Sequence, residues 1–230
     1  MSIYWIPRHY IQRFCLREGK HISGRVLDFG CGSKPYASFF PFATEYIGVE
    51  YDKRLGASDH YQNAGVHFYG GLSLPFESNS FDAIVSFQVF EHVQYLETTL
   101  IELIRIAKPG ARFLLTLPLL WPEHEVPADF RRLTRWGIEK LLLEAGLVVD
   151  EVSPMGSIYD VIIVFWLDYM NTHSSRLLRL LAPIVASPLN ILARALNSID
   201  PWATRRERFC YLDLSIRATK PKAVLSSASN

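Results

Sequence analysis

The amino-acid sequence predicts an α/β protein built on a doubly wound, mostly parallel sheet, and three observations support this fold class. Short apolar runs recur along the first two thirds of the 230 residues and alternate with helical patterns. These runs lack strict polar alternation, which is typical of parallel strands covered on both faces. The first run ends in a glycine-rich turn, and the second ends in an acid. Strand and helix in repetition form an open α/β sheet.

Five apolar runs are expected to form strands in the first part of the chain, and the fifth is stopped by Pro118. A sixth run follows Gly146, and the next clear strand comes much later in the sequence. The expected strands span residues 25–29, 46–50, 66–69, 81–87, 112–117, 147–152 and 209–217.

Two helices are expected between these strands. Residues 91–107 carry apolar side chains at helical spacing, and the Lys-Pro-Gly sequence of residues 108–110 ends that pattern. Thr134 is a suitable N-cap for a second helix, which stops at Gly146. The start of another helix is expected after the glycine turn of residues 30–32.

The segment between the last two expected strands differs from the rest of the chain. It reads as helices rich in leucine, isoleucine and aromatic residues, with arginines at its edges. We therefore expect one main domain from residues 1–153 and 209–220, an apolar helical insertion at 154–208, and a flexible tail at 221–230.

Composition excludes several classes of protein. The net charge of +1 offers no basic surplus for a nucleic-acid backbone, so nucleic acid is not an expected partner. The 3 cysteines show no disulfide or zinc spacing, which indicates a reducing, cytoplasmic compartment and no metal site. The N-terminus does not read as a signal peptide. The uncharged stretch 180–193 is 14 residues long, shorter than the roughly 20 that a spanning helix needs, so no membrane crossing is expected.

The glycine turn and the acid that follows it predict a nucleoside site. Gly30 and Gly32 follow the first strand directly, and Glu50 ends the second strand about 20 residues later. Glycines let a ligand approach the backbone, and an acid in this place accepts both hydroxyls of a ribose. Pro35 occupies the third glycine position of the dinucleotide pattern, which disfavours nicotinamide and flavin dinucleotides. The plain alternative is a turn with no binding function.

Four blocks, taken in order, resemble class I S-adenosylmethionine-dependent methyltransferases. More narrowly, they resemble the small-molecule enzymes of the ubiquinone-biosynthesis type, with a methyltransferase type 11 domain. The blocks are residues 26–32, 46–50, 74–93 and 106–110. The resemblance implies a Rossmann-like, seven-stranded, mostly parallel sheet with an antiparallel last strand and helices on both faces. The segment 154–208 then becomes an α-helical insertion before that last strand.

The resemblance implies S-adenosyl-L-methionine as the cofactor and a site at the strand ends. Its expected members are Asp28, Gly30, Gly32, Glu50, Tyr51, Gly71, Leu72, Phe87 and Gln88. Asp28, Gly30 and Gly32 would hold the methionine end of the cofactor, and Glu50 would hold the ribose. Tyr51, Gly71 and Leu72 would contact the adenine. Phe87 and Gln88 would line the methyl-transfer site. The chain departs from the family at Lys34, where a third glycine is usual, and at Gly70, where an aspartate often holds the adenine amino group.

Residues 121–134 form a second motif, which gathers His, Glu, Asp and Arg in one loop after the fifth strand. It resembles a block in methyltransferases of surface-polysaccharide and other cell-envelope pathways. His124 is the leading candidate for a general base, because histidine titrates near neutral pH. Asp129 is expected to orient it or to pair with Arg132. The alternative is a purely structural loop network.

His92 is a weaker catalytic candidate. It follows Glu91 directly, and adjacent helix residues do not face each other, so a capping or core role for the pair is the alternative.

The predicted function is methyl transfer to a small or lipid-linked acceptor, at oxygen, in cell-envelope, polysaccharide or other secondary biosynthesis. A catalytically inactive, methyltransferase-like binding subunit is the alternative that Gly70 keeps open. A nicotinamide-dependent oxidoreductase is a third, which Pro35 disfavours. The insertion is expected to cover the sheet, roof the acceptor pocket or form a homodimer face. Peripheral membrane contact through residues 157–204 is the other reading, since arginine and tryptophan edge its apolar helices.

Overall fold

The structure is a computed structural model, and it describes residues 4–51, 66–70, 73–203 and 205–222. Its centre is a seven-stranded sheet of order β3-β2-β1-β4-β5-β7-β6, in which only β7 runs antiparallel to its neighbours. This confirms the predicted fold class. The strands are β1 (Ser23–Phe29), β2 (Phe42–Tyr51), β3 (Val66–Tyr69), β4 (Phe81–Phe87), β5 (Ala107–Pro118), β6 (Val148–Met155) and β7 (Asp213–Thr219).

The strand order reverses between β1 and β4, and this places the ligand-binding crevice. Leu27 of β1 pairs with Ile47 of β2 on one side and with Ile84 of β4 on the other, all in parallel. The carboxyl ends of these strands therefore meet at one edge of the sheet. Such a reversal opens a crevice beyond the carboxyl ends, where α/β sheets bind ligands.

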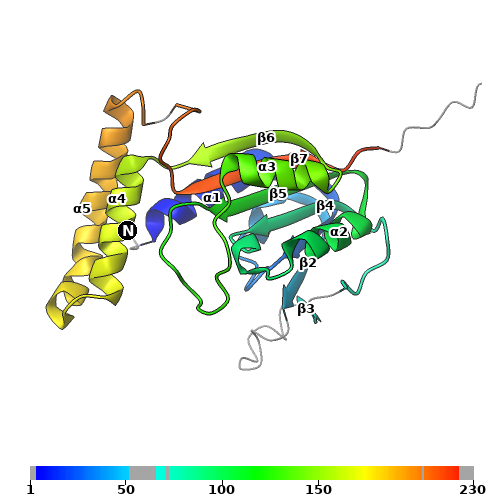
Figure 1. Cartoon of the computed structure of the whole chain (residues 1–230), viewed down its shortest axis with the longest axis horizontal. Coiled ribbons are helices and arrows are strands. Elements are labelled where there is room, and N and C mark those ends of the chain that lie inside the picture. The colour runs from blue at the N-terminus through cyan, green and yellow to red at the C-terminus, as the bar shows by residue number, and fades with distance from the viewer. Residues whose placement is uncertain (1–3, 52–65, 71–72, 204, 223–230) are drawn as a thin grey trace, which may run out of the picture.

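Helices cover both faces of the sheet, as predicted (Figure 1). The helices α2 (Leu96–Ile106) and α3 (Arg135–Glu144) pack on the face that carries Leu27 and Ile84. The helix α1 (Trp5–Gly19) packs on the opposite face, against Val26. Neighbouring strand residues point to opposite faces, so each buried strand needs apolar side chains at every position. Burial on both faces therefore explains why the apolar runs in the sequence are continuous.

Several element boundaries differ from the prediction. The helix expected at residues 91–107 begins at Leu96, because residues Phe90–His92 form a 3-10 turn, η4, and Val93 is extended. After the glycine turn the chain forms only the 3-10 turn η1 (Ala37–Phe39), since Lys34 has a φ of 57° that no α-helix accepts. The last strand begins at Asp213 rather than at residue 209. Thr134 is the N-cap of α3, as predicted, and its hydroxyl accepts from the Gly137 N–H at 3.2 Å.

The insertion forms a pair of helices, α4 (Ile158–Thr172) and α5 (Arg176–Ile199), which stand beside one end of the sheet (Figure 1). Asp160, at the start of α4, fastens this hairpin to the main domain. Its Oδ2 accepts from the Tyr10 hydroxyl of α1 at 2.9 Å, from the Ser157 N–H at 2.8 Å and from Asn197 Nδ2 of α5 at 3.0 Å. Burial of this carboxylate, which is 1% exposed, makes the three bonds a tight link.

The helix α5 is longer than the uncharged run 180–193 that it contains. It continues through Pro183 and Pro188 for 24 residues, and its best window has a mean hydropathy of 1.4. Length and composition alone would let it cross a membrane, although core helices of water-soluble proteins pass the same test. Only 22% of that window is buried, so most of the helix is uncovered within the described residues.

Candidate functional site

The turn after β1 requires glycine at residue 30. Gly30 has a φ of 73°, and a Cβ there would lie 2.4 Å from the side chain of Val89. The N–H groups of Gly30 and Cys31 both donate to the Val49 carbonyl, at 2.8 and 3.2 Å, so the turn closes onto β2. Cys31 is buried, and burial raises the pKa of its thiol to about 12. The backbone of the turn is therefore fixed in position, and the Cys31 thiol packed under it is unreactive.

Glu50, at the end of β2, is hydrogen-bonded to this turn. Its Oε2 accepts from the Gly32 N–H at 3.0 Å and its Oε1 from the Tyr51 N–H at 3.1 Å. The residue is 8% exposed, and it lines a cavity. A carboxylate that is fixed by two backbone donors is pre-positioned for further donors from a ligand.

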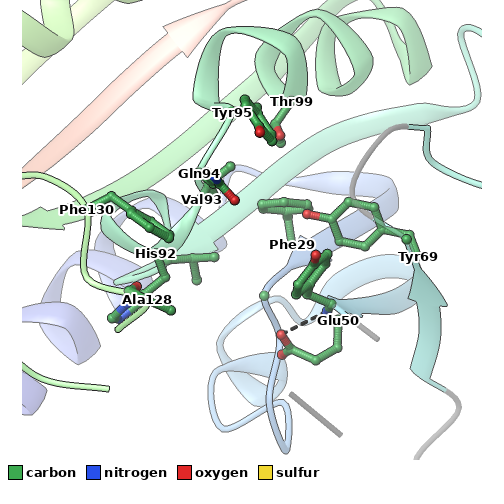
Figure 2. Close-up of a pocket in the computed structure, with 14 residues that line it drawn as sticks. Phe29, Glu50, Tyr69, His92, Val93, Gln94, Tyr95, Thr99, Ala128 and Phe130 are labelled. Atoms are coloured by element: carbon green, nitrogen blue, oxygen red, sulfur yellow. Dashed lines mark hydrogen bonds between the residues drawn. The ribbon is translucent and has the colours of Figure 1, made fainter. Parts of the chain in front are cut away.

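The first cavity has a volume of about 380 Å³ and lies beyond the carboxyl ends of β1, β2 and β3. Figure 2 shows Phe29, Glu50 and Tyr69 on one side of it and His92, Ala128 and Phe130 on the other. Of the predicted cofactor residues, Gly30, Glu50 and Tyr51 line it, and so does Gly70. Its lining is Phe29, Gly30, Glu50, Tyr51, Tyr69, Gly70, Val89, His92, Val93, Gln94, Tyr95, Thr99, Ala128 and Phe130.

Other predicted cofactor residues lie elsewhere. Asp28 is buried behind the turn, where it accepts from the Tyr46 hydroxyl at 2.8 Å, and burial raises its pKa to about 7. Phe87 packs against Tyr36, with ring centroids 5.0 Å apart, and is 8% exposed. Neither of them is among the described residues that line the cavity. The predicted adenine contacts at positions 71 and 72, Gly71 and Leu72, fall outside the described residues.

A second cavity of about 610 Å³ lies on the α1 side of the sheet edge. Gln88 lines it, with a φ of 57° that turns the chain just after β4. Segments far apart in the sequence make its wall: α1, the loop after β5, α4 and the first residue of β7. The lining is Tyr4, Pro7, Arg8, Ile11, Tyr36, Gln88, Trp121, Pro122, Glu123, His124, Glu125, Asp168, Thr172, His173 and Asp213.

Asp213 lines the second cavity and was not predicted from the sequence. It begins β7, is 1% exposed, and its Oδ2 has no hydrogen-bond partner within the described part of the chain. Burial raises the pKa of this carboxyl to about 8. An acid at the start of a late strand carries no sequence signal of its own, because only the fold brings it to this cavity.

Two histidines, one from each cavity, lie at the boundary between the cavities. His92 lines the first and His124 the second, and their ring centroids are 4.7 Å apart. Glu91 lies beside both: its Oε1 is 3.6 Å from His92 Nε2 and 4.0 Å from His124 Nε2. The expectation that Glu91 and His92 cannot face each other is wrong, because they sit in the 3-10 turn η4 and not in a helix. Burial raises the pKa of Glu91 to about 8.

Asp129 contacts both of its predicted partners, His124 and Arg132. Its Oδ2 accepts from the backbone N–H of His124 at 3.0 Å and lies 3.3 Å from His124 Nδ1. The same oxygen accepts from an Arg132 Nη at 2.7 Å, and that hydrogen bond lowers the pKa of Asp129 to about 2. The loop therefore holds the His124 ring in place through a carboxylate that stays ionised.

Comparison with known proteins agrees with this arrangement. The methyltransferase domain family matches residues 27–115. A Mycolicibacterium smegmatis protein named "Probable S-adenosylmethionine-dependent methyltransferase" is 30% identical over 160 residues, which cover 64% of this chain and 61% of that protein. An uncharacterized methyltransferase of Bacillus subtilis is 35% identical over 113 residues, 46% of this chain and 42% of its own. The chain thus spans less than two thirds of the length of these relatives.

Solved structures share the fold at low sequence identity. The Haloferax volcanii methyltransferase complexed with the Trm112 activator has a TM-score of 0.59 and 20% identity, covering 93% of this chain and 91% of that one. The YcgJ protein of Bacillus subtilis has a TM-score of 0.55 and 21% identity, covering 91% of this chain and 99% of that one. Residues 27–115 match the methyltransferase domain family, and the strand order, the glycine turn and the strand-end acid agree with that match.

Proposed function

We propose that this chain transfers a methyl group from S-adenosylmethionine to an oxygen of a small or lipid-linked acceptor. One observation carries the proposal. The first cavity, which holds the Gly30 turn and Glu50, meets the second cavity at the His92–His124 boundary. A donor in one cavity and an acceptor in the other would face each other there. The ubiquinone-type branch of the family stays a prediction.

The residues of the first cavity fit the cofactor. The Glu50 carboxylate suits the two ribose hydroxyls, and the aromatic rings of Tyr51 and Tyr69 suit a flat base. The backbone at Gly30 admits a close approach because no side chain stands there. When bound, S-adenosylmethionine supplies a methyl group that its positively charged sulfur has already activated. The protein then contributes mainly position, which is worth roughly 7–11 kcal/mol in favourable cases.

The acceptor side supports oxygen as the methylated atom. A hydroxyl acceptor must lose its proton, and His124 offers a ring nitrogen at the wall of the second cavity. Asp129 lies beside Nδ1, so Nε2 is the nitrogen left to receive the proton. Such a base contributes about 10²–10⁴-fold to the rate. Asp129 orients that base, and its bond to Arg132 keeps the orienting carboxylate charged.

The helical hairpin supports an acceptor with an apolar part. Asp168 and Thr172 of α4 and its C-cap residue, His173, line the second cavity. Leu177, Leu180 and Ile184 of α5 are exposed nearby in the sequence. The wall of the cavity carries charges, and the adjoining helix offers apolar surface. This combination suits a polar group linked to a lipid, as cell-envelope and polysaccharide biosynthesis supplies.

Calorimetry tests the cofactor first. The intact chain is titrated with S-adenosylmethionine and with its demethylated product, and we expect one site for each. A folded sample that binds neither compound would favour the catalytically inactive subunit.

Labelling then tests the transfer itself. Small-molecule and lipid extracts are incubated with the chain and S-adenosylmethionine that carries a deuterated methyl group. Mass spectrometry should find one compound heavier by that methyl group. Fragmentation then shows whether the label sits on oxygen, and a label on nitrogen or carbon would reject the base assigned to His124.

A further inference from the structure

We infer that Glu91, His92 and His124 form a binding site for a divalent transition-metal ion at the boundary of the two cavities. Each residue offers one ligand atom, and the three atoms lie within 4.8 Å of one another. The sequence predicted no metal site, because the spacing of its cysteines shows no ligand pattern. The cluster joins a turn after β4 to a loop after β5, so spacing along the chain gave no signal for it.

The Glu91 carboxylate gives the first argument for a bound cation. It is 1% exposed, and neither of its oxygens has a hydrogen-bond partner within the described residues. A buried carboxylate without partners loses its hydration and gains nothing in return, which is strongly unfavourable. Both facing nitrogens belong to histidines, at 3.6 and 4.0 Å, which are longer than hydrogen bonds. A cation between these three atoms would compensate the carboxylate directly.

The hydrogen bonds behind the two rings give the second argument. His92 Nδ1 lies 2.6 Å from the Ala128 carbonyl oxygen, and a carbonyl only accepts, so Nδ1 carries the proton and Nε2 the lone pair. His124 Nδ1 lies 3.2 Å from the Pro122 carbonyl oxygen and 3.3 Å from Asp129 Oδ2, which are acceptors too. Both rings therefore direct the lone pair of Nε2 toward Glu91. Metal-ligating histidines show this arrangement, in which a carbonyl or carboxylate holds the other ring nitrogen.

The ligand set indicates the class of ion. Two imidazoles and one carboxylate suit Zn²⁺ or Fe²⁺, whereas Mg²⁺ and Ca²⁺ prefer oxygen ligands alone. Three protein ligands leave at least one coordination position open, as in catalytic zinc sites. His92 lines the first cavity and His124 the second, so an open position can face either ligand.

A role in catalysis rests on the proposed function, whereas ion binding does not. An ion here would stabilise the negative charge of an acceptor oxygen, so that the hydroxyl proton leaves to solvent. The oxygen–carbon bond then forms as the sulfur–carbon bond breaks. His124 Nε2 cannot accept a proton while it binds an ion. The ion and the histidine base are therefore alternative means of removing the proton of the acceptor hydroxyl.

Metal titration of the intact, chelator-treated chain tests the site. We expect calorimetry to show one Zn²⁺ per chain and Co²⁺ to give the visible absorption of a low-coordinate site. Glu91→Gln keeps the size of the side chain but removes the charge, and His124→Ala removes a partly exposed ring. Each should weaken Zn²⁺ binding by about 100-fold or more, because loss of a supporting residue alone costs about 10–100-fold. His21→Ala, a change of an exposed histidine elsewhere, should bind as wild type does.

Two outcomes would overturn the inference: a folded wild type that binds neither Zn²⁺ nor Co²⁺, or equal binding by wild type and both ligand variants. Circular dichroism checks the folding of each variant. The same chelator-treated sample is then titrated with S-adenosylmethionine. Cofactor binding without metal binding rejects the metal site alone, and metal binding without cofactor binding rejects the proposed methyl transfer alone.

Discussion

The two cavities of this protein are built in different ways. The first takes part of its lining from the ends of three neighbouring parallel strands, where Gly30 and Glu50 lie in consecutive strand–turn units, and the rest from segments after β4 and β5. The second takes its wall from segments between Tyr4 and Asp213, almost the whole length of the chain. A site made at strand ends follows from the fold class itself. A site made where distant segments meet can change with each segment, so the family resemblance says little about the second cavity.

The chemistry of the two walls differs as well. Within the described residues Glu50 is the one acid that lines the first cavity, among several aromatic rings. The second carries Arg8 together with Glu123, Asp168 and Asp213. A wall with one acid and flat rings suits a nucleoside, whereas a wall with both signs of charge suits a ligand with several polar groups. If the cavities act as separate halves of the site, a substitution in one should leave ligand binding in the other unchanged.

The largest effect is expected from His124→Ala. Removing the candidate base should slow turnover by about 10²–10⁴-fold on an oxygen acceptor found by labelling, while affinity for S-adenosylmethionine stays at the wild-type value. Turnover is measured as transfer of labelled methyl, and affinity by calorimetry. Unchanged turnover would remove His124 as the catalytic base, and a lost affinity for S-adenosylmethionine would show that the two cavities are coupled.

A buried acid behind the first cavity should make stability depend on pH. The pKa of Asp28 is about 7 in the fold and has an ordinary value of 3.8, so the folded state keeps a proton that the unfolded state releases. Stability contributed by the protonated form is therefore lost as pH rises from about 4 to about 7, and the loss levels off above that. The full shift corresponds to roughly 4 kcal/mol. Asp28→Asn, which keeps the shape, should flatten this dependence in denaturant unfolding at a series of pH values.

Asp160→Ala should loosen the α4–α5 hairpin that forms one wall of the second cavity. The change leaves three donors, a buried one on Ser157 and partly buried ones on Tyr10 and Asn197, without their acceptor. We expect a loss of about 3 kcal/mol, or a melting temperature lower by roughly 6–12 °C. Asp150→Ala, an exposed position on β6, is the control and should change little. A melting temperature equal to that of the wild type would mean that the hairpin is not held by this network.

Glu50→Ala should weaken binding of S-adenosylmethionine by about 10- to 100-fold, which corresponds to the loss of one charged hydrogen bond of about 1.5–3 kcal/mol. Glu45→Ala, on the same strand but exposed and paired with Arg25, should bind as the wild type does. Calorimetry measures both. Equal affinities for the two variants would place the nucleoside away from Glu50 and reject the assignment of the first cavity.

The sequence by itself determined the sheet and the half of the site that lies at strand ends. Continuous apolar runs specify strands buried on both faces, the pair Gly30 and Gly32 specifies a turn that other residues would strain, and Thr134 specifies a helix start. These are local rules, because they depend on backbone conformation and on burial of neighbouring residues. The predicted start of a helix at residue 91 was wrong, because the spacing of apolar residues does not show that Val93 is extended.

Only the tertiary structure decided how the acceptor half is assembled. Glu91, His124 and Asp213 come from three separate segments, and nothing in their own neighbourhoods shows that they meet at the edge of the second cavity. The exposure of α5 was likewise decided by how the hairpin docks, because the same apolar sequence would serve a core helix. Contacts between distant segments depend on how whole elements pack, and that information is spread over the entire core rather than written at the residues that touch.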